Sequence, residues 1–560
     1  MFWVGLLIRG GGNNSPRPAS QRAAALVLTA AMLTTFTAPA FAGTWYIEDG
    51  DITISAGESG NNVTQNENTT ENDPDTIITN REEGASSHTV TIDAKDKDDK
   101  VEVTLKDVNI DASSRSEAAV SVTGKGDTTI ELDGDNELQG GDRHAGLEHN
   151  QTVDSEGNVT SGKLTIQDDN DNAGSLTATG GYFGAGIGGG SAKAGQVTIT
   201  GGTITAISGD GAGIGGGQGN MGSNAGNADI EISGGTIEAT GGYTSAGIGG
   251  GYYGDATIKI TGDAVIKNAT GGTFGAGIGG GGGGNGDVTI SGNAKIENAQ
   301  GGYAGSGIGG GYGASGTVAI KDDSTVTATG GEVGAGIGGG VGGLADITIE
   351  GNATVNATGG ESSIDEESGE KIPGGAGIGS GAGDAKANIT LEGKVTIVAK
   401  AGEGNAAIGD MNGEQVFTGL DGSITRYDSE GNDTTLPTDP GHPVPVPASP
   451  SSSGGGSADA SVQESVFPGL VVTDKDGQRI SYTSIRGNNV LSLRVGRFTA
   501  SLHASLSTLR QLRAEGIDTI TFQTILCSTT LSVDELLAMG GEDAEAVLTH
   551  RFTASSLTVG

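Results

Sequence analysis

The sequence predicts an all-β protein whose central part is a single-stranded parallel β-helix of about eleven or twelve coils, followed by a small C-terminal α+β domain. Glycine is far above its average frequency, at 107 of 560 residues, and aromatic residues make up only 4%. A glycine-rich heptapeptide returns at intervals of about 30 residues, which is the length range of one solenoid coil. Short Val/Ile/Thr segments with period two fill the intervals, as expected for half-buried strands.

Residues 1–42 have the features of an export signal. Three arginines precede an apolar stretch over residues 23–36, and a small-residue cleavage site ends at Ala42. The apolar stretch is too short to span a membrane comfortably. We therefore expect a signal peptide that is removed after Ala42, and a mature chain without a membrane span that is secreted or associated with the cell wall.

The repeat is centred on an isoleucine. Seven copies of Gly-Ala-Gly-Ile-Gly-Gly-Gly, some with one substitution, surround Ile187, Ile214, Ile248, Ile278, Ile308, Ile337 and Ile378, and a degenerate copy surrounds Ile408. Successive isoleucines are 27, 34, 30, 30, 29, 41 and 30 residues apart. The unequal spacing predicts one coil per copy, with loops of variable length at one corner.

Each interval holds two segments in which apolar and polar residues alternate. Together with the strand of the motif, they make three short strands per coil. The predicted inward pairs are Ile199/Ile204, Ile232/Ile237, Ile260/Ile266, Ile290/Ile296, Ile320/Val326, Ile349/Val355 and Leu391/Ile397, together with the motif isoleucines. Gly-Gly pairs such as Gly271-Gly272 are expected at corners where a Cβ would not fit. The β-helix is predicted to span residues 43–427, with an irregular cap and coils over 43–160 and regular coils over 161–427.

A change of composition marks the end of the coils. Residues 428–465 are rich in Pro, Ser and Gly and predict a linker, and residues 466–560 predict the α+β domain. Strands are expected near 470–473, 490–495 and 519–526. Four leucines predict a helix that ends at Gly516, namely Leu502, Leu506, Leu509 and Leu512, and a capping box from Ser532 to Glu535 predicts a second helix.

The charge distribution excludes some partners. The formal net charge is −39, but residues 466–560 carry nine acidic against eight basic side chains, so the acidity belongs to the coils and their flanks. No arginine lies between Arg143 and Arg426. Nucleic-acid binding needs phosphate-neutralising cations, so it is not expected. The single cysteine, Cys527, excludes an intrachain disulfide.

Eight aromatic residues gather beside the repeated motif: Tyr182, Phe183, Tyr243, Tyr252, Tyr253, Phe274, Tyr303 and Tyr312. Partly exposed rings in a row can stack on sugar faces while neighbouring Asn, Asp and Thr side chains hydrogen-bond to hydroxyl groups. The alternative is that the rings cover the apolar edge of the corner. The sequence leaves both interpretations open.

Acid-rich turns are candidate Ca²⁺ sites, because closely spaced carboxylates suit that ion and the ion would reduce self-repulsion. The candidate ligands are Asp133, Asp135, Asp168, Asp169 and Asp171, and residues 93–99 form a similar turn. Solvated acidic turns without metal are the alternative.

Catalytic interpretations are less favoured. The repeated motif matches the dinucleotide pattern G-x-G-x-x-G, but it recurs seven times and no helix is expected after it. Glycosidases need two carboxylates at a fixed separation, and the outward carboxylates look scattered. No catalytic residue is assigned.

The repeated motif, with Val-Thr-Ile-x-Gly-Gly-Thr-Ile strands and the segment over residues 132–138, resembles the carbohydrate-binding, pectate-lyase-like β-helix proteins of Gram-positive bacterial surfaces. The resemblance covers residues 43–424. It implies a right-handed helix, bound Ca²⁺ and affinity for plant-type polysaccharide. It offers no catalytic residues.

We therefore expect a non-catalytic carbohydrate-binding protein or adhesin that acts as a monomer, with a polysaccharide or a host or cell-surface glycan as its partner. A polysaccharide lyase or hydrolase is the first alternative. A structural component of the cell surface is the second.

Overall fold

The computed structural model describes residues 43–441 and 470–560, apart from residues 171, 220–225, 365–370, 384, 418–419, 476, 481, 488, 496, 498, 515, 525–526, 540–543 and 552–553. The predicted signal peptide and most of the predicted linker lie outside these residues, as does Asp171. Among the described residues, no helix has the length and apolar character needed to span a membrane.

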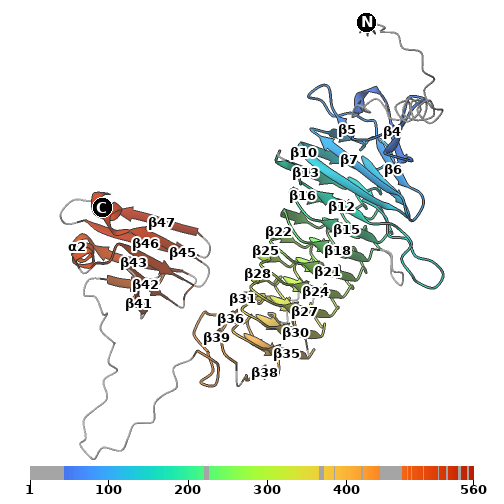
Figure 1. Ribbon diagram of the computed structural model, residues 1–560. Helices are drawn as coiled ribbons and strands as arrows, with labels where there is room; N and C mark the ends of the chain where they lie inside the picture. Colours follow the sequence, from blue (N-terminus) through green and yellow to red (C-terminus); the bar gives the residue numbers. More distant parts are fainter. Residues whose placement is uncertain are drawn as a thin grey trace, which may run out of the picture.

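Residues 44–427 wind into a parallel β-solenoid of about 14 turns (Figure 1). Each regular coil contributes three strands, as expected, and like strands of successive coils pair in parallel. The long strand β10 runs through two faces of the coil and joins them into one 22-stranded sheet. The third face is a 15-stranded sheet in which twelve strands pair in parallel, close to the predicted number of coils.

The first face consists of β1 (Thr44–Tyr46), β5 (Thr76–Thr79), β7 (Lys100–Lys106), β10 (Asp127–Gln139), β12 (Leu164–Gln167), β15 (Gly195–Ile199), β18 (Ala228–Ile232), β21 (Ala256–Ile260), β24 (Gly286–Ile290), β27 (Gly316–Ile320), β30 (Ala345–Ile349) and β35 (Ala387–Leu391). The second face contains the end of β10 with β8 (Asn109–Asp111), β13 (Gly174–Thr179), β16 (Thr203–Ile207), β19 (Thr236–Thr240), β22 (Val265–Thr270), β25 (Lys295–Gln300), β28 (Thr325–Thr329), β31 (Thr354–Thr358), β36 (Thr396–Lys400) and β39 (Ser423–Tyr427).

The parallel strands of the third face are β2 (Ile52–Ala56), β6 (Val90–Ala94), β9 (Val120–Gly124), β11 (Leu147–His149), β14 (Ile187–Gly188), β17 (Ile214–Gly215), β20 (Ile248–Gly249), β23 (Ile278–Gly279), β26 (Ile308–Gly309), β29 (Ile337–Gly338), β34 (Ile378–Gly379) and β37 (Ile408–Asp410). The antiparallel strands β3 (Asn61–Gln65), β4 (Asn68–Asp73) and β38 (Gly413–Glu414) lie at its two ends. A small hairpin, β32 (Ser362–Ile364) with β33 (Lys371–Pro373), fills the longest interval between motif isoleucines.

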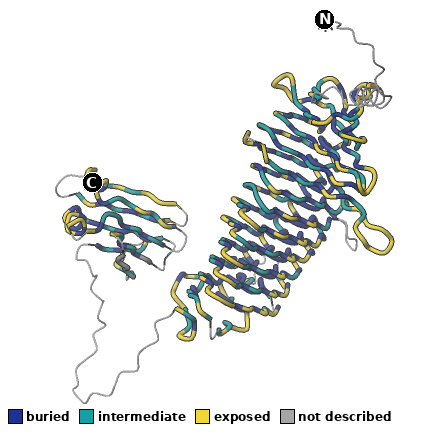
Figure 2. Tube along the Cα trace, viewed as in Figure 1, coloured by how far each residue is buried: buried dark blue, intermediate teal, exposed yellow. Residues whose placement is uncertain are grey.

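The core is a set of aliphatic ladders inside the solenoid. The motif isoleucines pair directly with one another, as in Ile187 with Ile214 and Ile214 with Ile248. All the inward residues predicted from the repeat are buried (Figure 2). Because each ladder residue packs against its equivalents above and below, the coils stabilise one another and none could bury its side chains alone.

The glycine pairs at the corners are required by close backbone approach. A Cβ on Gly272 would lie 1.7 Å from the carbonyl oxygen of Gly242 in the preceding coil. At Gly202 a φ of +86° adds the left-handed backbone that only glycine adopts easily. The prediction for these corners is confirmed.

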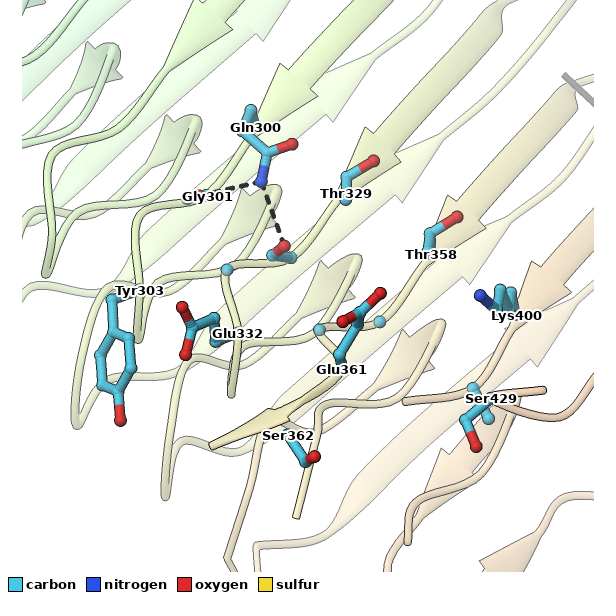
Figure 3. A pocket seen from close by; sticks show the side chains of 15 residues that line it. Gln300, Gly301, Tyr303, Thr329, Glu332, Thr358, Glu361, Ser362, Lys400 and Ser429 are labelled. Carbon is cyan, nitrogen blue, oxygen red and sulfur yellow. Dashed lines mark hydrogen bonds between the residues drawn. The ribbon is translucent and has the colours of Figure 1, made fainter. Parts of the chain in front are cut away.

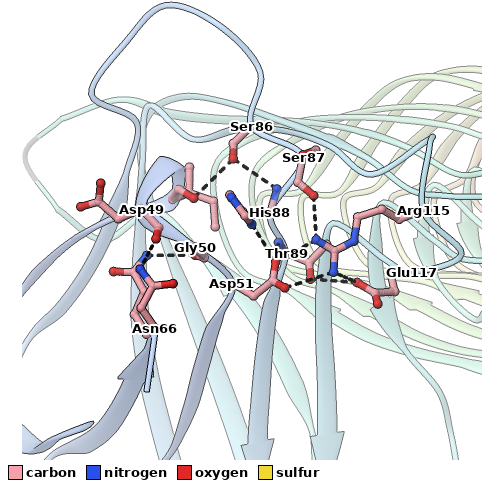
Figure 4. A network of polar contacts seen from close by, with 12 residues as sticks. Asp49, Gly50, Asp51, Asn66, Ser86, Ser87, His88, Thr89, Arg115 and Glu117 are labelled. Atoms are coloured by element: carbon pink, nitrogen blue, oxygen red, sulfur yellow. Dashed lines mark hydrogen bonds and ion pairs between the residues drawn. The ribbon is translucent and has the colours of Figure 1, made fainter. Parts of the chain in front are cut away.

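The N-terminal coils are tied together by a polar network (Figure 4). Arg115 donates two hydrogen bonds to the carboxylate of Asp51, at 2.9 and 3.1 Å, and pairs with Glu117 at 2.6 Å. Asp51 also accepts from the Thr89 backbone at 2.9 Å and contacts the His88 ring at 3.2 Å. These residues precede β2, β6 and β9, so the network links three neighbouring coils. The antiparallel strands β3 and β4 then cover the open edge, as the predicted cap should.

The C-terminal end is capped by chain beyond the last strand. Residues 428–441 fold back over the last coil, where the Ile424 amide donates to the carbonyl of Pro440 at 3.1 Å and Asp439 is buried. The start of the predicted linker is therefore part of the solenoid cap.

Residues 470–560 form the predicted α+β domain, with two four-stranded sheets and two helices among the residues described there. One sheet contains β40 (Leu470–Thr473), β43 (Thr499–Ser505), β46 (Glu545–Arg551) and β47 (Ala554–Val559); the other contains β41 (Thr483–Gly487), β42 (Val490–Arg494), β44 (Thr519–Gln523) and β45 (Ser528–Ser532). The helices are α2 (Leu506–Ala514) and α3 (Val533–Met539), and the Ser532 hydroxyl accepts from the Glu535 amide at 3.4 Å. Leu502 belongs to β43 and not to the helix, because its alternating neighbours extend that strand across the sheet.

Candidate functional site

A turn at one corner of each coil carries most of the predicted aromatic residues. It connects a strand of the second face to the short Ile-Gly strand of the third face, and it follows the Gly-Gly pair. The residue directly after that pair points outward. Tyr182, Tyr243 and Tyr303 occupy this position with 62%, 60% and 36% of their surface exposed. We call these three residues the tyrosine ridge.

The next position in the turn faces inward and fixes the ridge. The rings of Tyr182 and Phe183 lie 4.6 Å apart at 85°, and those of Tyr243 and Phe274 lie 5.6 Å apart at 85°. Phe274 packs against a small cluster formed by Ala304, Val333 and Ala382. The inner aromatic residues thus cover an apolar edge, as one interpretation of the sequence predicted.

The turn that follows the motif strand closes over the same edge. The Tyr312 amide donates to the Phe274 carbonyl at 2.8 Å, and the Ala382 amide donates to the Val333 carbonyl at 2.8 Å. The Tyr312 ring lies 5.4 Å from Phe274 but remains half exposed. The two turns therefore hide the outer side of the Ile-Gly strand, which explains why its glycines are buried.

Tyr252 and Tyr253 form a separate pair on the turn after the motif. Their rings are 4.1 Å apart and the Tyr252 hydroxyl donates to the Tyr253 hydroxyl at 3.2 Å. This hydrogen bond, assisted by partial burial and by the charge of Tyr253, raises the pKa of Tyr252. The pair is half-buried and is not part of the tyrosine ridge.

A groove of about 720 Å³ continues the ridge towards the C-terminal coils (Figure 3). Its walls come from the ends of the second-face strands and from the Gly-Gly turns that follow them. The polar and aromatic side chains on it are Gln300, Tyr303, Thr329, Glu332, Thr358, Glu361, Ser362, Lys400 and Ser429. The Gln300 amide donates to the carbonyls of Gly301 and Gly330, both at 3.1 Å, so it bridges two coils. The groove offers hydroxyls, an amide, two carboxylates and one ammonium group beside an aromatic ring.

Glu332 and Glu361 correct the expectation that outward carboxylates are scattered. Each directly follows a corner Gly-Gly pair, and a Cβ on Gly360 would lie 1.7 Å from the Gly331 carbonyl oxygen. The two glutamates therefore stand at equivalent positions on neighbouring coils, where the ridge has tyrosine. Sequence reasoning missed them because the long insertion after Glu361 hides the alignment, although the repeated Thr-Gly-Gly-Glu is visible in both copies.

The predicted calcium ligands that the structure describes contact different protein groups. Asp133 pairs with Lys106 at 2.7 Å, and Asp135 accepts from the Ser175 hydroxyl at 2.8 Å. One carboxylate oxygen of Asp168 accepts from the Gly174 amide at 3.1 Å. The turn over residues 168–170 folds around Glu131, which accepts from the Asp169 amide at 2.8 Å. Asp171 lies outside the described residues.

The described part of the chain contains no group of three His, Cys, Asp or Glu side chains placed to hold a metal ion. Asp133, Asp135 and Asp168 each contact a protein group instead. The calcium prediction therefore stays a prediction.

The comparison with protein families agrees with the fold. A family model described as a Beta helix repeat matches residues 172–191, 197–218, 230–252 and 318–341. No curated protein and no solved structure matches the chain. The family match falls within the ladder-forming coils, so the chain is a parallel β-helix protein whose repeats are similar to those of the Beta helix repeat family.

Proposed function

We propose that this β-helix protein binds a glycan on the tyrosine ridge and in the adjoining groove without cleaving it. The observation that carries the proposal is the row of exposed tyrosines, Tyr182, Tyr243 and Tyr303, on a solenoid surface that has few other aromatic rings. An exposed ring stacks on the apolar face of a sugar, and its hydroxyl remains available for a hydrogen bond.

The groove supplies the polar half of sugar recognition. Gln300, Thr329 and Thr358 present amide and hydroxyl groups next to Tyr303, and Glu332 and Glu361 can accept hydrogen bonds from sugar hydroxyls. Repulsion from the surrounding acidic coils disfavours a polyanion, so a neutral glycan is the favoured ligand class.

We propose that the protein binds its glycan outside the cell or at the cell wall. Residues 1–42 predict export, so the protein acts outside the cell or at its wall as a monomer, and its partner is a polysaccharide or a host or cell-surface glycan. Of the acid-rich turns, the one at Asp168 would bind Ca²⁺ as a structural ion, because one oxygen of its carboxylate is buried without a hydrogen-bond partner among the described residues.

A glycan array with the full-length chain tests the proposal. We expect binding that is lost when all three ridge residues are changed, in Tyr182→Ala/Tyr243→Ala/Tyr303→Ala. The matched control is Val153→Ala, which removes an apolar side chain that is 56% exposed in an N-terminal hairpin. Retained binding by the triple variant would refute the site. An empty array would favour a structural component of the cell surface instead.

A hydrolase is the second candidate, because Glu332 and Glu361 stand in one groove on neighbouring coils. Coils repeat every ~4.8 Å, and retaining glycosidases hold their two carboxyl groups about 5 Å apart. Release of reducing ends from a bound polysaccharide, abolished in both Glu332→Gln and Glu361→Gln, would establish this function. Unsaturated products would indicate a lyase. Binding without either product supports the non-catalytic proposal.

A further inference from the structure

The three ridge tyrosines lie on alternate coils. Their coils carry the motif isoleucines Ile187, Ile248 and Ile308, and Ile214 and Ile278 mark the coils between. Successive coils are hydrogen-bonded in parallel, so each step is ~4.8 Å and neighbouring ridge tyrosines are about 10 Å apart along the solenoid. The ridge is therefore a ladder of rings with a regular period.

In the two intervening coils the ridge position holds a small residue. In the coil of Ile278 the ridge position holds Thr273, a small polar residue. In the coil of Ile214 the turn is shorter: six residues lie between Ile207 and Ile214, whereas seven lie between its strand partner Thr179 and Ile187. Gly209 is the residue left at that corner, next to the backbone of Tyr182. Thus no bulky side chain of the ridge position stands between two tyrosines.

Two of the rings are held in place by the layer beneath them. Tyr182 and Tyr243 each make a perpendicular contact with a phenylalanine, Phe183 and Phe274, which is itself half-buried under the turns. Holding a ring before the ligand arrives lowers the entropy that binding must offset. The rings of Tyr182 and Tyr243 are therefore held in place before a glycan binds.

We infer that the ridge is matched to a neutral, linear, β-1,4-linked glycan that lies parallel to the solenoid axis, with one disaccharide for every two coils. In such a ribbon each sugar is turned over relative to the one before it, so the same face returns once per disaccharide, at about the tyrosine spacing. Curled chains, such as β-1,3- or α-1,4-linked glucans, do not present a flat face at that interval. This inference rests on the proposed glycan-binding function.

An exchange of ridge residues between two coils tests the period without changing composition. In Tyr243→Thr/Thr273→Tyr the middle ring moves by one coil, so the spacings become three coils and one coil. We expect the full-length protein to bind cellohexaose and N-acetylchitohexaose better than laminarihexaose. The exchange should lower the affinity for the first two about tenfold, the loss of one stacked ring. Cellobiose, which spans one ring, should lose no more than about twofold.

The outcomes separate the two proposals. Unchanged hexasaccharide affinity in the exchanged variant, with an unaltered circular dichroism spectrum, would overturn the period but leave glycan binding intact. Equal affinity of the unaltered protein for laminarihexaose would also overturn the inference. Hexasaccharide binding that survives the triple Tyr→Ala variant would overturn the proposed function itself. An exchanged variant that misfolds is replaced by Tyr243→Thr alone, which should lose affinity for hexasaccharides but not for disaccharides.

Discussion

Arg426 and Asp439 form a fully buried ion pair at the C-terminal end of the solenoid. The guanidinium donates to both oxygens of the carboxylate, from Nε at 2.7 Å and from Nη2 at 3.0 Å, and neither side chain is exposed. Arg426 also donates to the carbonyls of Ile408 and Gln415, at 3.2 and 2.7 Å, and contacts Glu414. These bonds hold residues 428–441 over the last coil and satisfy a strand end that would otherwise be open.

Removing the charge of Asp439 is predicted to destabilise the cap. Asp439→Asn removes the fully buried counter-ion of Arg426 and leaves the partly exposed Glu414 beside the guanidinium, so we expect a loss of about 3 kcal/mol. Hydrogen exchange should show the loss in β37 and β39 first, because coils in a solenoid interact mainly with their neighbours. Glu297→Gln is the control, since Glu297 forms an exposed pair with Lys295 and should contribute within about 1 kcal/mol. Equal losses in the two variants would contradict a structural role for the buried pair.

Alanine at Gly272 is predicted to disrupt the solenoid. Its Cβ would lie 1.7 Å from the Gly242 carbonyl oxygen, so two coils would have to separate at the corner. We expect poor folding or a strong fall in the thermal midpoint, measured by circular dichroism. Gly84→Ala is the matched control, because nothing lies within 4 Å of its Cβ, and it should change stability by less than about 0.5 kcal/mol. A normally folded Gly272→Ala protein would show that the corner is looser than described.

Two histidines of one coil are predicted to titrate on opposite sides of the ordinary value of 6.5. A hydrogen bond with Glu148, at 2.8 Å, raises the pKa of His144, and burial lowers the pKa of His149, which is 2% exposed. The contribution of His144 to the free energy of unfolding is therefore fully present below pH 6.5, and it is lost as the pH rises through the pKa of His144 in the folded protein. Stability from His149 is present above pH 6.5 and lost as the pH falls towards its folded pKa.

NMR titration of the two imidazole rings measures this order directly. The His144 midpoint should lie above that of His149, and His144→Gln should remove only the loss of stability on the alkaline side. A His149 midpoint at or above that of His144 would contradict the described burial.

Calcium is predicted to raise the thermal midpoint through the turn at Asp168. One oxygen of this carboxylate, Oδ1, is buried and has no hydrogen-bond partner among the described residues. A divalent ion would supply the missing partner and reduce local acidic repulsion. The shift should disappear in Asp168→Asn and persist in Asp133→Asn, because Asp133 is already paired with Lys106. A thermal midpoint that does not change in millimolar Ca²⁺ would contradict calcium binding at this turn.

The ladders could be predicted from the sequence because they repeat. Ile199 and Ile204 alternate with polar residues, and the same pattern returns in every coil, so many weak signals point to one structure. The handedness, expected from the resemblance, stays a prediction. The cap at Arg426 gave no such signal. The cap depends on Arg426 and on Asp439, which follows a proline-containing segment, and neither residue is part of the repeat.

The candidate site was predicted only in part for the same reason. The exposed tyrosines stood out because aromatic residues are rare, but exposure separated Tyr182, Tyr243 and Tyr303 from the inner rings only in three dimensions. Glu332 and Glu361 align only when the long insertion after Glu361 is left out of the repeat. The strand that holds Leu502 was mistaken for helix because leucines four residues apart suit both a helix and the junction of a strand with a helix.

A crystal structure of the full chain with bound cellohexaose would show whether the tyrosine ridge binds a glycan along the solenoid. We expect an oligosaccharide parallel to the stacking direction of the coils, with alternate sugars on Tyr182, Tyr243 and Tyr303. A sugar that crosses the coils, binds another face or the C-terminal domain, or fails to bind at saturating concentration would contradict it.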